Sequence, residues 1–309
     1  MSTTLEIEAF ALTDVGIQRA HNEDALDVVR DEGLYIVADG MGGHASGQVA
    51  SRLAVENLRK YVCDLAPRPE HEFTYPTAEG AGPPEVLLSN AIQWANERIY
   101  IESLKDRALE GMGTTIVCCL EYENFLVLGH VGDSRIYRLR GGAIGQVTRD
   151  HSLLNHLIDQ GKLSSPEEIA GFRDRNIIVK ALGLKDYVEP TVRVVDRQHG
   201  DIFVLCTDGL TDQVEDWIIT NVIEGNEADL DAACAALVRL ANDAGGKDNC
   251  TIMLLRVIDP EQEPDEPTHP GIDAQPDTDD GQLPDELPID WDEDTAIGDE
   301  SILPLKDGD

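Results

Sequence analysis

Apolar residues recur along the first 257 positions of the chain with two different periods, and each period predicts a kind of element. Alternating apolar residues and short apolar runs predict strands over residues 5–12, 34–38, 114–120, 125–131, 135–140, 143–147, 192–195, 202–206 and 250–257. Apolar residues about four apart predict amphipathic helices over residues 48–63, 86–101, 153–159, 166–170, 213–223 and 229–241. Clusters of strands therefore alternate with helices.

The connections between these elements indicate the fold class. Between residues 114 and 147 the strands follow one another closely, with Gly141 and Gly142 as a hairpin turn. Such strands must pair antiparallel, because a parallel crossover needs about a dozen residues. Strand clusters separated by paired helices favour an α+β fold with stacked sheets in the middle and helices outside. Residues 67–84 have no period and predict a surface connection.

The composition changes near residue 258. Residues 258–309 hold eight of the 15 prolines, and 19 acidic residues against a single base, Lys306. This segment carries −18 of the formal net charge of −36. It cannot bury enough apolar surface to offset the entropy of ordering. We therefore predict a folded domain over residues 1–257 and a disordered acidic, proline-rich tail over residues 258–309.

Charge and cysteine usage restrict the class of protein. A net charge of −36 without a basic patch predicts that neither nucleic acid nor an anionic membrane surface is bound. The N-terminus lacks the features of a signal peptide, and no run of about 18 apolar residues predicts a membrane span. Most of the six cysteines lie in apolar runs, which favours buried thiols in a reducing compartment. We expect a cytoplasmic monomer.

Acidic residues recur where predicted strands end. They are Glu23, Asp24, Asp39, Asp133, Asp208, Asp212 and Asp248. One Asp before a Gly is usually a turn residue, but five such corners in one domain predict a cluster. Converging carboxylates raise one another's pKa unless cations neutralise them. Oxygen ligands, without Cys/His pairs at zinc spacing, favour Mg²⁺ or Mn²⁺ over Zn²⁺.

Two such ions, about 3.5 to 4 Å apart, can share a bridging water and clamp the attacking and leaving oxygens of an in-line displacement at phosphorus. Arg19, four residues before Glu23, is a candidate for binding the phosphate, although an isolated Arg is by default a solvated surface residue. His44 could be a general acid or, equally, a loop histidine. Gly40, Gly42 and Ala45 fit a dinucleotide-binding fingerprint, but the second strand that this fingerprint requires is missing.

Eight motifs occur in a fixed order along the chain. They are DVGIQRAHNED (14–24), VADGMGGHASG (37–47), GMGTT (111–115), VGDSRIY (131–137), TRDHS (148–152), ALG (181–183), CTDGLTD (206–212) and GKDN (246–249). The ordered set resembles the bacterial PPM family, the PP2C-type metal-dependent protein serine/threonine phosphatases, over residues 5–257. The resemblance implies an αββα sandwich with two central antiparallel sheets.

The resemblance also implies roles for residues and a cofactor, Mn²⁺ or Mg²⁺. Asp39 matches the carboxylate that bridges two ions, and Arg19 matches the phosphate-binding arginine. The other implied ligands are the Gly40 carbonyl on one ion, Asp208 and Asp248 on the other, Glu23 and Asp24 partly through water, and Asp133 and Asp212 at a third, weaker ion. Thr114 and Thr115 would support the centre. Met41 stands where the eukaryotic pattern has a histidine general acid, so with His44 three residues later the proton donor stays open.

The function implied is hydrolysis of phosphoserine and phosphothreonine in proteins, opposing serine/threonine kinases in signalling. Phosphorylated proteins and such kinases are then the expected partners. The alternative is a phosphatase-like module without catalysis that binds partners through its acidic tail, although an intact ligand set argues against it. Residues 157–172 resemble the bacterial family's flap over the site or form a plain surface loop. Thr295 in the tail is a phosphorylation candidate or part of a solvating linker.

Overall fold

The structure is a computed structural model that describes residues 5–42, 46–175 and 177–262. These residues belong to one compact unit that extends to residue 263. The last described strand ends at Ile258. Most of the predicted tail lies outside the described residues, so the domain boundary near residue 258 and the disorder of the tail stay predictions.

The first sheet is five-stranded and antiparallel, with the order β1-β11-β10-β7-β8. Its strands are β1 (Glu6–Asp14), β7 (Arg135–Arg140), β8 (Ala143–Gln146), β10 (Ile202–Cys206) and β11 (Cys250–Ile258). Every residue of β10 is buried. This burial on both faces explains why β10 is a continuous apolar run rather than an alternating one.

The second sheet is also antiparallel, with the order β2-β3-β5-β6-β9, and β4 pairs with the end of β3. Its strands are β2 (Asp24–Val29), β3 (Leu34–Met41), β4 (Gly113–Thr114), β5 (Ile116–Tyr122), β6 (Phe125–Val131) and β9 (Thr191–Asp196). In β3, Leu34, Ile36 and Ala38 face the helices, whereas Tyr35 and Val37 face the other sheet. Both sets are apolar because both faces of the strand are covered.

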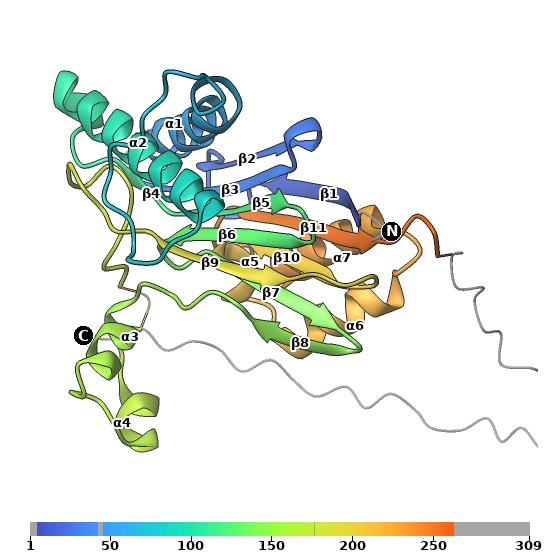
Figure 1. The fold of residues 1–309 in the computed structure, drawn as a ribbon. Coiled ribbons are helices and arrows are strands. Elements are labelled where there is room, and N and C mark those ends of the chain that lie inside the picture. Colours follow the sequence, from blue (N-terminus) through green and yellow to red (C-terminus); the bar gives the residue numbers. More distant parts are fainter. Residues whose placement is uncertain (1–4, 43–45, 176, 263–309) are drawn as a thin grey trace, which may run out of the picture. The chain divides into compact units, whose positions relative to one another are not determined.

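Helices cover the outer face of each sheet (Figure 1). The helices α1 (Ser46–Lys60), which continues into a π-helical turn at Tyr61–Leu65, and α2 (Pro83–Lys105) pack on the second sheet. The helices α5 (Asp208–Thr211), α6 (Asp216–Gly225) and α7 (Leu230–Asp243) pack on the first. A third apolar core fills the space between the sheets. The predicted αββα sandwich is therefore confirmed.

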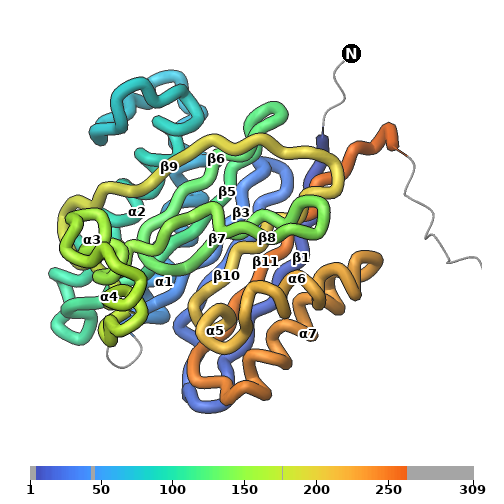
Figure 2. The backbone as a smooth tube through the Cα atoms, turned by 90° about the horizontal axis from the view of Figure 1, so that it is seen from below, coloured from blue at the N-terminus to red at the C-terminus, as the bar shows by residue number. Residues whose placement is uncertain are grey.

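Two short helices, α3 (Leu153–Asp159) and α4 (Pro166–Gly171), stand apart from the sandwich (Figure 1) and lie next to each other in both views (Figure 1 and Figure 2). The Ser165 side chain caps α4 by accepting a hydrogen bond from the backbone N–H of Glu168 at 3.1 Å. Neither helix has a buried residue. The base of this projection is tied down by the Leu153 N–H, which donates to the Ile177 carbonyl at 2.7 Å.

Three details differ from the prediction. The strand β2 was not predicted, because DALDVV is only half-buried and pairs with a single neighbour. The helix predicted from residue 213 begins at Asp216, since α5 and the turn at Val214 precede it. The prediction also omitted two single 3₁₀ turns, Arg30–Glu32 and Arg107–Leu109.

Within the described part of the chain no helix is long and apolar enough to cross a membrane.

Candidate metal centre

The register of the β2–β3 hairpin places Asp24 directly opposite Asp39. Like charges facing each other across two strands destabilise a sheet unless something offsets them. The backbone of Asp39 is held firmly: its carbonyl accepts from the Thr115 N–H and the Thr114 hydroxyl, each at 2.8 Å. These bonds fit the supporting role expected of the two threonines.

The other sheet brings two more carboxylates to the same place. Asp208 follows β10 as the first residue of α5, and Asp248 precedes β11. The carboxyl groups of Asp39 and Asp208 lie close enough to act on each other's pKa. Burial raises the pKa of Asp39 well above its ordinary value, and the nearby Asp24, Asp208 and Asp248 raise it further. Without cations, this crowding favours the protonated form of Asp39.

Asp24 is buried with only one of its carboxylate oxygens satisfied. Its Oδ2 accepts from the hydroxyls of Thr207 at 3.0 Å and Thr251 at 2.6 Å. Its Oδ1 has no hydrogen-bond partner, and neither has Oδ1 of Asp208. Burial raises the pKa of Asp24, against the effect of the two threonine hydrogen bonds. Both bare oxygens need a cation or a proton.

The side chain of Glu23 and the carbonyl of Gly40 approach one point beside the start of α1. A methyl group on Gly47 would lie 2.6 Å from Oε2 of Glu23 and 2.8 Å from the Gly40 oxygen. The Glu23 N–H donates to Oδ1 of Asn249 at 2.7 Å, and Asn249 also donates to the carbonyls of Val15 and His21. Gly47 thus leaves room for two predicted ligand oxygens.

Arg19 lies at the exposed edge of this cluster, with 47% of its side chain accessible. Its Nη2 donates to Oδ2 of Asp248 at 2.5 Å, and its Nε to the Lys247 carbonyl at 3.4 Å. Its charge also opposes the rise that burial causes in the pKa of Glu23. The structure therefore places Arg19 beside the carboxylates, as predicted.

Asp133 and Asp212 both interact electrostatically with Asp208. Burial raises the pKa of Asp133 to about 7, and among the neighbouring charges Asp208 has the largest effect. Burial also raises the pKa of the more exposed Asp212, whose charge in turn acts on Asp208. Nearby, Arg135 forms a two-pronged ion pair with Asp150, with bonds of 2.7 to 3.1 Å. The two predicted ligands of a third ion therefore both lie within electrostatic reach of Asp208.

Two other sequence interpretations have different outcomes. His44, the candidate general acid, lies outside the described residues. The rejection of the dinucleotide fingerprint is confirmed, because β3 pairs antiparallel with β2, β4 and β5, whereas that fold requires a parallel crossover.

The residues present fit a pair of hydrated divalent ions. Among the residues that the structure describes, no three His, Cys, Asp or Glu side chains converge closely enough to form one ion's ligand set. Mg²⁺ keeps several waters and takes only one or two carboxylates, so two ions that share Asp39 need no such triplet. The fit rests on the bare oxygens of Asp24 and Asp208 and on the crowding of carboxylates around Asp39, where positive charge is needed.

Sequence reasoning missed four residues that organise the centre: Asn249, Thr207, Thr251 and Asp150. Asn249 and Thr207 adjoin predicted ligands, and this adjacency was the available signal. Thr251 is a polar residue in an otherwise apolar strand, yet it is fully buried. Its partner Asp24 is 227 positions away, so spacing could not reveal the pair.

Comparison with known proteins gives one consistent result. Residues 17–247 match the model of the family described as protein phosphatase 2C. Serine/threonine protein phosphatase PstP of Mycobacterium tuberculosis is 36% identical over 256 residues, which are 83% of this chain and 46% of PstP. Protein phosphatase PhpP of Streptococcus pneumoniae is 34% identical over 260 residues, which cover 83% of this chain and 100% of PhpP.

Solved structures agree. The catalytic domain of PstP in complex with two manganese ions has a TM-score of 0.68 at 34% identity and covers 83% of this chain and 100% of that one. The serine/threonine phosphatase of S. agalactiae has a TM-score of 0.69 at 33% identity, with 81% and 99% covered.

The chain belongs to the protein phosphatase 2C family. The family resemblance inferred from the ordered motifs is thereby confirmed, and so is the family's fold. The chain spans just under half the length of the M. tuberculosis relative that it matches.

Proposed function

We propose that this chain hydrolyses phosphoserine and phosphothreonine in proteins and requires a pair of Mn²⁺ or Mg²⁺ ions. One observation carries the proposal: carboxylates from the two sheets crowd around Asp39, and two buried oxygens among them, Oδ1 of Asp24 and Oδ1 of Asp208, have no hydrogen-bond partner. Such a cluster is costly unless cations enter it. The names of the relatives, serine/threonine protein phosphatases, supply the substrate class.

Each residue has a distinct task in this proposal. Asp39 would be the ligand common to both ions, the Gly40 carbonyl would help to hold one of them, and Asp208 and Asp248 would help to hold the other. Glu23 and Asp24 complete the site, and Asp133 with Asp212 forms a weaker third one. When bound, the ions lower the pKa of a water and offset charge on the phosphoryl oxygens.

Arg19 binds and orients the phosphate. Its guanidinium is half-exposed and has an ion-pair partner in Asp248. Two parallel N–H donors suit two phosphate oxygens. Asp248 would also be needed as a metal ligand, and Arg19, once released from this ion pair, would be free to turn toward substrate.

Asp39→Asn tests the proposal. We expect manganese-dependent hydrolysis of p-nitrophenyl phosphate and of a phosphothreonine peptide to fall at least about 100-fold, since the bridging charge is lost. Asp31→Asn, which changes an exposed aspartate of a surface 3₁₀ turn, should match the wild type. EDTA should abolish the wild-type rate. Equal rates for wild type and Asp39→Asn would leave the alternative, a partner-binding module without catalysis.

The cellular location, the oligomeric state, the cellular role and the domain boundary belong to the same proposal. We place the protein in the cytoplasm of a bacterium, as a monomer that opposes serine/threonine kinases in signalling. Its named relatives are bacterial, and its six cysteines are all unpaired, which suits a reducing compartment. Phosphorylated proteins are the substrates, and the catalytic domain ends near residue 257.

A further inference from the structure

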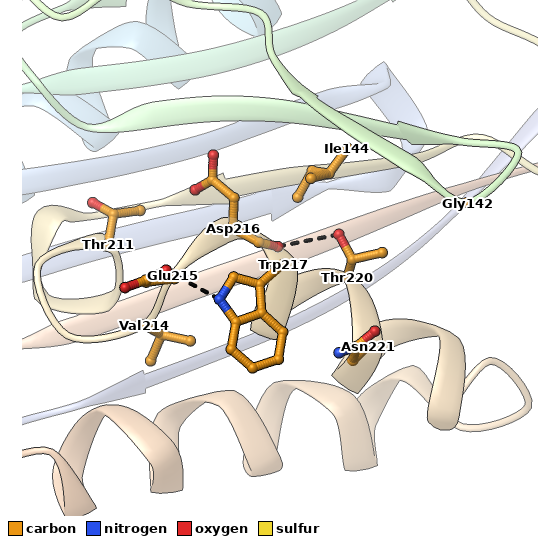
Figure 3. A pocket seen from close by; sticks show the side chains of 9 residues that line it. All are labelled: Gly142, Ile144, Thr211, Val214, Glu215, Asp216, Trp217, Thr220 and Asn221. Atoms are coloured by element: carbon orange, nitrogen blue, oxygen red, sulfur yellow. Dashed lines mark hydrogen bonds between the residues drawn. The ribbon is translucent and has the colours of Figure 1, made fainter.

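A groove of about 720 Å³ lies between the β7–β8 hairpin and α6. Figure 3 shows Thr211 at one end and Gly142 at the other. The lining residues are Gly142, Ile144, Thr211, Val214, Glu215, Asp216, Trp217, Thr220 and Asn221. None of the predicted metal ligands lines it, so the groove needs a separate explanation.

Trp217 forms the exposed wall of this groove. Its side chain is 60% exposed although Trp gains more than other residues from burial. Its Nε1–H donates to Oε2 of Glu215 at 3.0 Å, which restrains the indole plane (Figure 3). Ile144 and Val214 add apolar surface beside it. The protein thus presents a restrained aromatic surface to a partner.

The groove is negatively charged. Glu215 and Asp216 line it, and Oε1 of Glu224 would lie 3.1 Å from a methyl group on Gly142 at the far end. No lining residue is basic among those that the structure describes. An indole face beside carboxylates attracts an ammonium or guanidinium group whose aliphatic stem covers apolar surface.

The groove also adjoins the metal centre. Thr211 is the last residue of α5, and Asp208 is its first. Three residues of helix rise only about 4.5 Å, whereas an extended peptide advances about 3.3 Å per residue. A peptide whose phosphorylated residue lies at the centre therefore reaches the groove within a few residues.

We propose that this groove binds a lysine or arginine side chain of the phosphoprotein substrate, a few residues from the phosphorylated position. The inference rests on the proposed phosphatase function. It makes Trp217 and Glu215 specificity residues that act on peptides and leave small substrates unaffected.

Binding can be measured without catalysis. In metal-free protein, the indole N–H resonance of Trp217, assigned with Trp217→Phe, is followed during titration with an unphosphorylated peptide that carries one lysine among uncharged residues. We expect a saturable shift that is absent when norleucine replaces the lysine and weaker in Glu215→Gln. An equal shift with norleucine would overturn the proposal. So would a shift caused by protein concentration alone, which would assign the groove to a second copy.

Kinetics then test the role in substrate choice. A single lysine is moved stepwise along a neutral phosphothreonine peptide. We expect kcat/KM to rise about tenfold at one or two positions. Trp217→Ala should remove this gain and leave p-nitrophenyl phosphate and the lysine-free peptide unchanged. Phe73→Ala, at another exposed aromatic residue (47%), should keep the gain.

The two proposals fail separately. Hydrolysis of every peptide at the same rate, in wild type and Trp217→Ala, would overturn the proposed role of the groove in substrate binding and leave the phosphatase function intact. Lysine-dependent binding without hydrolysis of any phosphopeptide would overturn the phosphatase function, and with it the groove's role in substrate choice.

Discussion

At the scale of single residues, Asp24 is a carboxylate that the proposed function requires but that lowers the stability of the metal-free protein. A buried carboxylate with one bare oxygen and acidic neighbours costs free energy in the metal-free protein. Removing a buried charge that has no partner can stabilise a fold, whereas breaking a buried ion pair destabilises it. Residues kept for function commonly lie at positions where another residue would be more stable.

Asp24→Asn should therefore stabilise the metal-free protein. The asparagine keeps an acceptor for Thr207 and Thr251, and its amide replaces the bare oxygen near Asp39. We expect a gain of about 1 kcal/mol at pH 7.5, or a rise of about 2–4 °C in Tm. The same substitution should shrink the rise in Tm that Mn²⁺ produces, because a ligand is lost. Differential scanning calorimetry with EDTA and with Mn²⁺ measures both effects.

A matched control is Asp201→Asn. Asp201 is also fully buried, but it is paired with Arg140 through bonds of 2.5 and 2.6 Å. Asp201→Asn should therefore lower the free energy of unfolding by about 2 kcal/mol, with or without metal. If Asp24→Asn destabilised the metal-free protein as much as Asp201→Asn does, Asp24 would not be the strained carboxylate inferred from its contacts.

At the scale of elements, two stacked histidines connect β6 to the base of the α3–α4 projection. The rings of His130 and His151 lie 4.5 Å apart between centroids. His151 accepts the Gly132 N–H on Nδ1 at 3.1 Å, while its backbone carbonyl accepts the Val179 N–H. Since Nδ1 accepts, His151 is neutral in this arrangement. The stack therefore joins the loop before Asp133 to the projection.

The stack predicts a loss of stability in acid. Burial, with His130 and Lys180 nearby, lowers the pKa of His151 to about 3, and burial lowers that of His130 too. Below about pH 6.5 the unfolded chain binds protons that the folded protein excludes, so stability falls as the pH decreases. We expect His151 to contribute a slope approaching 1 kcal/mol per pH unit between pH 6.5 and 5.

Urea unfolding at several pH values checks this slope as a difference between variants. The asparagine of His151→Asn places an acceptor near the position of Nδ1 but does not titrate. The difference in free energy of unfolding between the wild type and this variant should therefore shrink as the pH falls. His156→Gln, at an exposed position of α3, should run parallel to the wild type. A constant difference between wild type and His151→Asn would show that His151 titrates alike in both states.

The elements themselves show what a sequence can predict. The bounds of β6, β7, β10 and α3 were predicted to the residue, because glycines, charges and capping residues delimit their apolar runs. β2 and α5 were missed, since an edge strand and a four-residue helix are too weakly patterned. At the site, ordered motifs predicted the carboxylates, but the bonds from Thr251 and Asn249 depend on residues over 220 positions away.

At the scale of the whole molecule, the two ends of the described chain meet in one sheet. β11 pairs along its full length with β1 and also with β10, so the sheet is complete only when residue 258 has been made. Its core residues, such as Ile252 and Leu254, pack against α6 and α7. Such pairing between distant segments makes folding depend on nearly all of the first 258 residues.

A chain that ends at Gln262 should therefore keep the stability and activity of the full chain, whereas one that ends at Asn249 should not fold. The first retains every described strand, and the second lacks β11 between β1 and β10. We expect the free energy of unfolding of the Gln262 chain to lie within about 0.5 kcal/mol of that of the full chain. Stabilisation by added salt should also be smaller in the Gln262 chain, because the deleted residues 263–309 carry −16 of the net charge of −36. Urea unfolding at low and high salt, with manganese-dependent hydrolysis of p-nitrophenyl phosphate, measures these effects. A lower urea midpoint in the Gln262 chain would mean that the acidic segment contributes to the fold.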